Sequence, residues 1–295
     1  MLEGYRGLES KRSQRRLKEL RYSFHLLWNS PLTLIGIVLA LVVIVIALIA
    51  PLIAPYGPEQ RIWTDKIAPP SMSHLLGTDD TGGDIFSRIL YGYRLDLAIA
   101  SSVVLVAVIF GCVLGSISGF LGGRIEEGLM RITDVFLSIP SLILAMSIAV
   151  VMGRSVLNLA LAMAITWWPA YARLIRGQVM VEKQKLYVDA AKAYGIGNIR
   201  ILFHHIVPNS IYPVMVKATL DLGAAILTTA ALSFLGFGVE PGAAELGRMV
   251  ADGRQFVFSA PWIVSAPGVA IFVLCLGLNL VGDGLRDILD PRLRR

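Results

Sequence analysis

Long apolar runs, separated by short charged segments, dominate the pattern of hydrophobic and polar positions in this chain. A helix needs about twenty apolar residues to cross the hydrocarbon core of a bilayer. Charges delimit six runs of about that size, which predict six transmembrane helices and an all-α integral membrane protein. The runs lie at 32–56, 97–123, 135–153, 155–172, 212–239 and 255–282.

Lys and Arg are distributed unequally between the segments that connect these helices. If the N-terminus is inside, nineteen of them fall in inner segments and seven in outer ones. Basic residues collect on the cytoplasmic side of membrane proteins. The pattern therefore predicts that both termini and the polar segment after the fourth run are cytoplasmic.

These boundaries divide the chain into a series of predicted parts. They are a basic cytoplasmic tail (1–30), a first transmembrane helix (31–56), an extracytoplasmic segment (57–94), a core of five transmembrane helices (95–282) with a cytoplasmic loop inside it (186–208), and a cytoplasmic C-terminal tail (283–295). The segment at 57–94 is too short for a stable core of its own. We expect it to pack on the outer face of the bundle, with 84–95 as an amphipathic entry to the second span.

Composition agrees with the membrane interpretation. Hydrophobic residues make up 55% of the chain and charged residues 16%, whereas soluble domains carry roughly a quarter charged residues. The net charge of +6 follows from the cytoplasmic bias in basic residues, so no nucleic-acid partner is expected. Both cysteines, Cys112 and Cys275, lie in apolar runs, where a thiol packs as a small hydrophobe.

The polar stretch Tyr187–Asn209 is predicted to form two short helices. Asp189 falls in the first turn of the first helix, where it complements the helix dipole. Gly195 stands where a residue with positive φ commonly ends a helix. Apolar residues at helical spacing predict an amphipathic second helix, which Pro208 is expected to end. These apolar residues are Ile199, Leu202, Phe203 and Ile206.

The order of residues in this stretch resembles the EAA loop of ABC importer permeases. It runs Asp189-Ala190-Ala191, then Gly195, then His205-Ile206-Val207-Pro208. Asp189 replaces the Glu that is usual in that family. In the family, this loop is the coupling helix that sits in a groove of the ATPase subunit. The resemblance thus implies an ATPase-coupling role for Asp189, Ala190, Ala191, Gly195, Ile199, Leu202, Phe203 and Pro208.

Three further segments are similar to C-type permeases of dipeptide, oligopeptide and nickel importers, a group of binding-protein-dependent inner-membrane components. The segments are His74–Arg88, Ser233–Gly238 and Asn279–Pro291, and with the loop they extend the resemblance over roughly residues 30–293. Gly83 stands where that family normally has Arg. The resemblance implies that an extracytoplasmic binding protein docks on the region of Gly77, Thr78, Asp79, Asp84 and Arg88, together with the 238–261 loop.

The same resemblance implies a type I ABC importer permease fold in the cell inner membrane. The chain would form half of the translocation pathway for di- or oligopeptides. Its implied partners are a second, B-type permease, two ABC ATPases, the binding protein and the lipid bilayer. ATP and Mg are expected on the ATPases, because the chain has no Gly-Lys dipeptide and hence no phosphate-binding loop. We expect a non-catalytic subunit without a cofactor.

Two patterns inside the spans allow two interpretations each. Lys217 and Asp221, at i,i+4 spacing, are either a structural pair or, with Thr228 and Thr229, part of the pathway lining. Small residues every four positions in the second span serve either packing within the chain or contact with a second membrane subunit. These residues are Gly111, Gly115, Gly119 and Gly123.

Other function classes are less well supported by the sequence. Within the importer class, nickel or an oligosaccharide could replace the peptide. An ion-coupled secondary transporter would need ionisable groups deep in the bundle, for which Lys217 and Asp221 are the one candidate pair. A membrane-embedded enzyme would need a catalytic or metal motif within the spans, and all four histidines lie outside the apolar runs. The adjacent His204 and His205 would point about 100° apart on a helix, so no metal site is expected there.

Overall fold

The computed structural model describes residues 30–289, a chain of helices joined by loops. Within this range, four helices are long and apolar enough to cross a membrane. They are α2 (Pro31–Ile53), α3 (Ile85–Leu121), α10 (Tyr212–Phe234) and α12 (Trp262–Leu289). A fifth span results if α4 (Gly123–Ser138) and α5 (Ser141–Met152) cross as one bent pair. The prediction of an all-helical membrane protein is confirmed at this level of four to five candidate spans.

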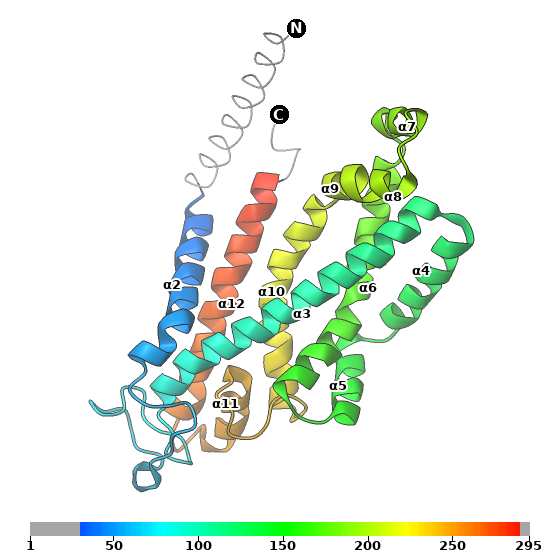
Figure 1. The fold of residues 1–295 in the computed structure, drawn as a ribbon. Coiled ribbons are helices and arrows are strands. Elements are labelled where there is room, and N and C mark those ends of the chain that lie inside the picture. The colour runs from blue at the N-terminus through cyan, green and yellow to red at the C-terminus, as the bar shows by residue number, and fades with distance from the viewer. Residues whose placement is uncertain (1–29, 290–295) are drawn as a thin grey trace.

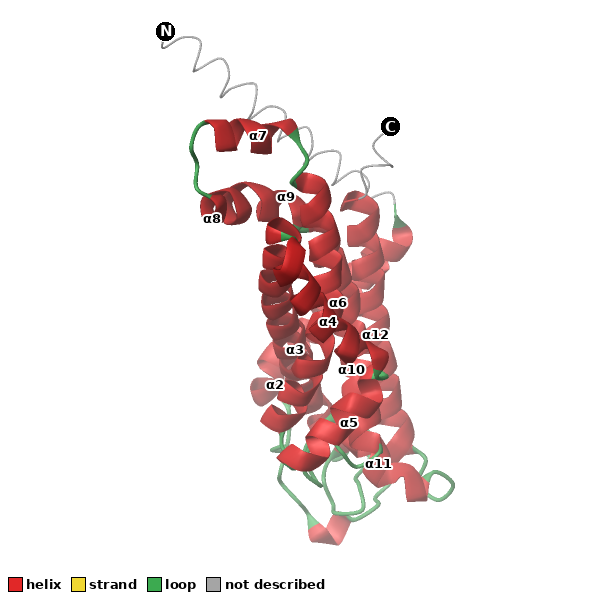
Figure 2. Cartoon of the chain, turned by 90° about the vertical axis from the view of Figure 1, so that its right-hand side faces the viewer, coloured by secondary structure: helices red, strands yellow, loops and turns green. Residues whose placement is uncertain are grey.

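The helices form an elongated bundle with two different ends (Figure 1). One end carries the start of α2, the end of α12 and the loop helices from α7 (Leu186–Ala193) to α9 (Val207–Ser210). The opposite end carries the segment between α2 and α3, together with α11 (Leu246–Gly253) (Figure 2). The two candidate sites predicted from the sequence therefore lie at opposite ends of the bundle.

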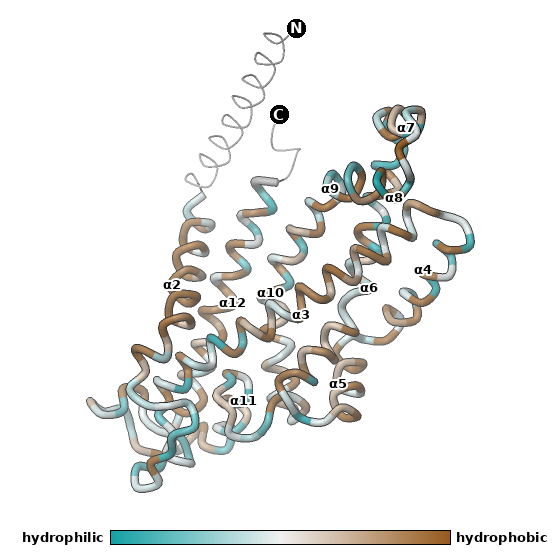
Figure 3. Tube along the Cα trace, in the orientation of Figure 1, coloured by the Kyte–Doolittle hydropathy of each residue, from teal (hydrophilic) through white to brown (hydrophobic). Residues whose placement is uncertain are grey.

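Hydropathy follows the same division along the bundle (Figure 3). Apolar residues dominate the middle of the helices, and polar residues gather at both ends. Large apolar side chains on α2 point outward, with Leu48 at 72% and Leu52 at 85% exposure. Contiguous exposed apolar surface of this kind suits contact with lipid or with another membrane subunit.

The third predicted span, 135–153, is not one straight helix. α4 and α5 meet at an angle of 89°, and the break falls at Ile139 and Pro140. Ile139 is extended, with φ −101° and ψ 131°. A residue that precedes proline is disfavoured in the α conformation, so Pro140 explains the bend inside an otherwise continuous apolar run.

The ends of other helices also differ from the predicted ones. α2 stops at Ile53, because Ala54 precedes Pro55 and is extended. α3 begins at Ile85, so the predicted entry at 84–95 is the first part of one helix of 37 residues. α12 continues to Leu289, past the predicted start of the C-terminal tail at 283. The predicted N-terminal tail, apart from Ser30, and residues 290–295 lie outside the described range.

α6 (Val156–Glu182) is the helix against which α3 packs. The glycines of α3 allow the two backbones to touch. A Cβ on Gly111, Gly115 or Gly119 would lie 2.6, 2.1 or 2.8 Å from a carbonyl oxygen of α6. The three oxygens belong to Trp168, Ala172 and Arg176, each one turn further along α6. Three of the four predicted glycines therefore serve packing within the chain, whereas Gly123 begins α4 and a Cβ on it would contact nothing.

We predict that Gly115→Ala separates α3 from α6, because no side chain can yield where the new methyl group meets a backbone carbonyl. Overpacking of this kind costs about 1–3 kcal/mol. The purified importer complex should therefore unfold at a lower temperature. The control is Gly177→Ala on α6, where a Cβ meets no atom within 4 Å. Equal unfolding temperatures for the two variants would contradict this account of the helix contact.

Candidate functional site

The loop between α6 and α10 begins with a helix whose end is defined by glycine. α7 is followed by Gly195 at φ +75°, as its position in the sequence predicted. The Gly195 N–H donates to the Lys192 carbonyl at 2.9 Å, and the Ile196 N–H donates to the Ala191 carbonyl at 3.1 Å. This pair of bonds is the Schellman motif. Asp189 lies in the first turn of α7 and is exposed.

The second part of the loop differs from the prediction. After α8 (Asn198–Arg200), residues Ile201–Ile206 form a π-helix that leads into α9. In a π-helix hydrogen bonds join residues five apart, so Ile201 and Ile206 face the same way and are both fully buried. The predicted stripe is therefore half wrong, because Ile199 is 78% and Phe203 43% exposed.

Pro208 does not end this helix, contrary to the prediction. It lies in the first turn of α9, which continues the π-helix without a break, since Ile206 and Val207 are both helical. The backbone remains helical through Ile211, with φ −77° and ψ −22°, and enters α10 directly. The His205 carbonyl accepts the Asn209 side-chain N–H at 2.7 Å and the Tyr187 hydroxyl at 3.5 Å. The loop thus ends in a helical junction with α10.

One hydrophobic cluster joins the loop to the bundle. Val188 and Ala191 of α7 are buried with Ile201, Leu202 and Ile206 against residues of α6 and α10. These residues are Ile175, Val179 and Val214. The Tyr187 hydroxyl adds a hydrogen bond to Glu182 Oε1 at 2.9 Å, at the end of α6. A displacement of the loop must therefore move α6 and α10.

Other large apolar side chains of the loop are exposed. Leu186, Tyr194 and Ile199 are 86%, 87% and 78% exposed. Beside them, a hollow is lined by Gly197, Asn198, Ile199, Arg200, Phe203 and His204. Of the residues predicted for coupling, Asp189, Ala190, Gly195, Ile199, Phe203 and Pro208 are exposed, and Ala191 and Leu202 are buried. Across residues 30–289, no His, Cys, Asp or Glu residues form a group of three or more that could hold a metal ion.

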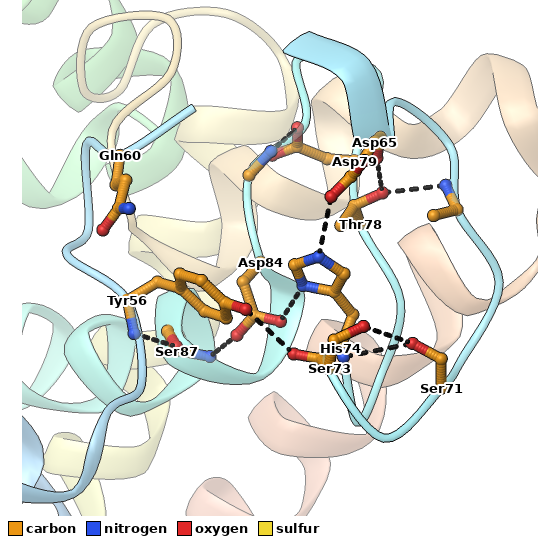
Figure 4. A network of polar contacts seen from close by, with 12 residues as sticks. Tyr56, Gln60, Asp65, Ser71, Ser73, His74, Thr78, Asp79, Asp84 and Ser87 are labelled. Carbon is orange, nitrogen blue, oxygen red and sulfur yellow. Dashed lines mark hydrogen bonds and ion pairs between the residues drawn. The ribbon is translucent and has the colours of Figure 1, made fainter. Parts of the chain in front are cut away.

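At the other end of the bundle, His74 connects the segment between α2 and α3, here called by its predicted location the outer segment, to the start of α3 (Figure 4). Its ring nitrogens lie 3.0 Å from Asp84 Oδ1 and 3.4 Å from Asp65 Oδ2. The second oxygen of Asp84 caps α3 by accepting the Ser87 N–H at 2.8 Å. The Tyr56 ring stacks on the imidazole with a centroid separation of 5.1 Å.

Asp79 organises the next turn of the outer segment. It accepts hydrogen bonds from the Thr81 N–H and the Gly83 N–H, both at 2.8 Å, and forms an ion pair with Arg88. Burial raises the pKa of Asp79, but the Arg88 charge and these hydrogen bonds outweigh it, so the pKa lies below its usual value. The neighbouring Asp80 has a raised pKa, because it is partly buried and lies near Asp79 and Asp252.

The ion pair also reaches the loop before α11. Arg88 donates to the carbonyl oxygens of Gly242 and Ala243 at 3.0 and 3.1 Å. Arg61 donates to the same Gly242 oxygen at 2.9 Å. A Cβ on Gly83, the departure from the family pattern, would lie 3.1 Å from Arg61 Nη1. The guanidinium of Arg61 therefore fills the space next to a position where the family normally has Arg.

These contacts show where the predicted docking residues lie. Gly77, Thr78, Asp79, Asp84 and Arg88 are all buried. They hold the segment between α2 and α3 against the 238–261 loop and against Trp262, whose indole N–H donates to the Thr78 carbonyl at 3.4 Å. The structure thus brings the two predicted docking regions together, with the named side chains beneath the surface.

Lys217 and Asp221 form an ion pair at 2.9 Å on α10. The Tyr171 hydroxyl of α6 donates to Asp221 at 2.5 Å, and the Lys217 ammonium lies 5.2 Å from the centre of the Tyr171 ring. Thr229 is buried, and its hydroxyl lies 3.4 Å from the Met163 sulfur, whereas Thr228 bonds to its own helix. The charged pair thus belongs to the contact between α6 and α10.

Arg61 and Tyr171 were not predicted from the sequence. A hydroxyl group within the apolar run 155–172, which holds few hydrogen-bonding groups, indicates that Tyr171 could bond to Lys217 or Asp221 of the fifth span. Arg61 carried no local signal, because its partner Gly242 lies 181 positions away.

Comparison with known proteins adds a family. Residues 111–295 match the family model described as binding-protein-dependent transport system inner membrane component. Residues 20–70 match the N-terminal TM domain of oligopeptide transport permease C. The dipeptide transport system permease protein DppC of Alkalihalophilus pseudofirmus is 43% identical, over 93% of this chain and 90% of that protein.

Two further comparisons agree with these matches. The glutathione transport system permease protein GsiD of Pectobacterium atrosepticum is 41% identical, over 82% of this chain and 81% of that protein. A solved chain of the inward-facing MetNI methionine ABC transporter superposes with a TM-score of 0.52. That likeness covers 68% of this chain and 96% of the other at 19% identity, so it concerns the fold alone.

We predict that Asp79→Asn destabilises the outer segment, because it leaves the buried Arg88 charge unpaired. Losses of about 3–5 kcal/mol are typical when one partner of a buried ion pair is removed. The measurements are the unfolding temperature of the complex and the rate of proteolysis within residues 57–83. Since the pKa of Asp79 is lowered on folding, its stabilising contribution is present above the unfolded pKa and is lost as pH falls through the folded value. The difference between wild type and variant should therefore shrink in acid.

Asp80→Asn is the matched control for this prediction. The pKa of Asp80 is raised, so its charge is unfavourable in the folded protein, and its removal should leave stability unchanged or increase it. If Asp79→Asn and Asp80→Asn had the same effect, the special role of the Asp79–Arg88 pair would be refuted.

Proposed function

This chain belongs to the family of binding-protein-dependent transport system inner membrane components, and from that premise we propose how it works within an ABC importer. It is a C-type permease, a non-catalytic membrane subunit of a di- or oligopeptide importer. We propose that it forms half of the translocation pathway and that a B-type permease forms the other half. Two ABC ATPases supply the energy, and they alone bind ATP and Mg.

The proposed cargo is a short peptide. The relatives are named for dipeptides, for di- and tripeptides, and for glutathione, which is itself a tripeptide. Their names support a peptide over nickel or an oligosaccharide. An ion-coupled secondary transporter loses its main support, because Lys217 and Asp221 are engaged with each other and with Tyr171.

In the proposed topology the chain crosses the membrane six times and has both termini in the cytoplasm. The spans are α2, α3, the bent pair α4 and α5, α6, α10 and α12. The cytoplasmic bias in Lys and Arg supports this orientation. So does the position of α7–α9, at the end of the bundle where α2 starts and α12 finishes (Figure 1).

The proposed coupling site is the exposed apolar face of the loop, with Leu186, Tyr194, Ile199 and Phe203. The single observation that carries this role is that the loop buries one set of apolar side chains in the bundle and leaves another set of large apolar side chains exposed. Apolar surface rimmed by polar residues marks contact sites for partners. We propose that an ATPase covers this face and that its closure moves α6 and α10 through the cluster beneath.

The proposed docking site for the binding protein is the outer surface that the buried Asp79–Arg88 network supports. In this proposal the residues predicted for docking do not touch the binding protein themselves. They hold the 57–84 segment and the 238–261 loop together, and these two present the docking surface. Lys217, Asp221, Thr228 and Thr229 are proposed to lie beside the pathway, where the pair sets the spacing of α6 and α10.

Cysteine crosslinking tests the coupling site directly. Tyr194→Cys and Ile199→Cys, in the complete importer, should crosslink to an ATPase subunit, because both positions are more than three-quarters exposed on the proposed contact face. Leu52→Cys, 85% exposed on α2, is the control and should not. Failure to capture an ATPase from either loop position would remove the proposal.

Gly195→Leu tests the rigidity of the loop. No atom lies within 4 Å of a Cβ at this position, so the substitution acts through the backbone alone. A left-handed conformation costs an ordinary residue about 1–2 kcal/mol. We expect weaker stimulation of ATP hydrolysis by the loaded binding protein, and slower peptide uptake.

Asn is the residue that best replaces glycine at such a position, so Gly195→Asn should retain most of both activities. A Gly195→Leu complex with wild-type stimulation and uptake would show that the geometry of this turn is not needed.

A further inference from the structure

The start of α11 is wedged between α3 and α10. A Cβ on Gly92 of α3 would lie 2.9 Å from a methyl carbon of Leu246, and a Cβ on Gly247 would lie 2.3 Å from the Cα of Ala230 on α10. Two carboxyl groups lie in this tight contact. Asp96 of α3 is 2% exposed and Glu245, which precedes α11, is 0% exposed. Neither has a role in the proposed coupling or docking.

The hydrogen bonds at this junction distinguish the two acids. Glu245 accepts the Gly247 N–H at 2.9 Å with Oε1 and the Arg248 N–H at 2.6 Å with Oε2. Asp96 accepts the Leu246 N–H at 3.3 Å with Oδ2. The first three amide groups of α11 are thereby used. Asp96 Oδ1 is buried and has no partner within the described part of the chain.

The charged and titratable groups around the pair do not neutralise it. Tyr93 comes from α3 itself and Cys275 from α12, and neither carries a positive charge. Ser233 comes from α10. Arg248 of α11 is engaged with Asp252 at 2.6 Å. Between residues 30 and 289, neither carboxyl forms an ion pair with Lys or Arg.

Asp96 accepts the N–H of Leu246, the residue directly after Glu245, so the two buried carboxyl groups lie close together at the start of α11. Two such groups with no cation beside them are strongly unfavourable when both are charged. Such pairs commonly retain one proton between them. Glu245 is suited to the charge, because both of its oxygens accept N–H groups at the start of a helix. Asp96 is suited to the proton, because its buried Oδ1 accepts no hydrogen bond. As a protonated hydroxyl, Oδ1 can donate one instead.

We propose that Asp96 binds a proton at Oδ1 at neutral pH and donates it in a hydrogen bond to Glu245, so that this pair is a proton-binding site that holds α11 against α3. Binding is a reversible exchange of one proton with water, and no other bond changes. Loss of the proton places two negative charges in contact and favours separation of α11 from α3.

The site has a consequence for the outer face of the protein. α11 also contributes Met249, Asp252 and Gly253 to a hollow whose other wall includes Asp80 and Arg88. By holding α11 in place, the proton therefore stabilises one side of this hollow, and the Asp79–Arg88 ion pair stabilises the other side. High external pH should loosen this surface.

Asp96→Asn and Glu245→Gln, made in the complete importer complex, test the assignment. The amide of Asn donates to Glu245 as the protonated acid does, and its oxygen still accepts the Leu246 N–H. The amide of Gln at 245 places its NH₂ group against an N–H of α11. We expect Asp96→Asn to keep the neutral-pH unfolding temperature and Glu245→Gln to lower it.

The pH dependence gives the second readout. In the folded protein Asp96 keeps a proton that the unfolded chain releases, so its contribution is present at low pH and is lost as pH rises. The unfolding temperature of wild type should fall toward alkaline pH, and that of Asp96→Asn should fall less. The exposed Glu240→Gln, on the same loop, should behave as wild type at every pH.

Infrared spectroscopy reports the proton directly. The spectrum of wild type minus Asp96→Asn should contain the carbonyl stretch of a protonated carboxylic acid, shifted in D₂O. Absence of that band overturns the proposal. So does an Asp96→Asn complex that fails to assemble or unfolds earlier than Glu245→Gln, because either result means that Asp96 functions as the charged partner.

Discussion

The close approach of α3 and α6 is the contact on which the rest of this permease depends. Three glycines allow the backbone of one helix to rest on carbonyl oxygens of the other over two turns. α3 is capped by Asp84 and carries Arg88 and Asp96 near its start, and α6 leads directly into the loop that contains α7–α9. The Lys183 ammonium, just after α6, donates to the Phe120 carbonyl near the end of α3 at 2.5 Å. Because packed interiors resist compression, this pair of helices connects the two faces as a stiff unit.

α10 provides a second connection of a different kind. It meets the loop through a continuous helical junction, and it meets α6 through Tyr171, Lys217 and Asp221. Its outer part contacts the start of α11, where Ala230 touches Gly247. The contact to α6 is therefore made by side chains, polar at Asp221 and apolar around Val214 and Ile226, whereas α3 and α6 touch along their backbones. Relative movement within the bundle is more easily accommodated between α6 and α10 than between α3 and α6.

The sequence predicted those features that depend on nearby residues. Four candidate spans and the positive φ of Gly195 follow from local runs and from one turn residue. The bend before α5 was missed because Pro140 lies within an apolar run, and the π-helix because Ile201 and Ile206 do not match the 3.6-residue period. The hydrogen bonds of Arg88 to the loop before α11 could not be predicted for another reason. Arg88 bonds to residues 154 and 155 positions away, and no local pattern reports such a pairing.

The outer segment follows a different physical rule from the bundle. Between α2 and α3 there is too little apolar surface for an independent core, so ion pairs and hydrogen bonds to distant carbonyls hold the segment in place. Buried pairs of this kind contribute specificity of geometry more than net stability. Arg61 bonds to the loop before α11, and His74 and Asp79 bond to the start of α3, so the shape of this end of the bundle depends on the position of those elements. A binding protein that docks there would therefore contact a surface whose geometry reports the arrangement of the helices beneath it.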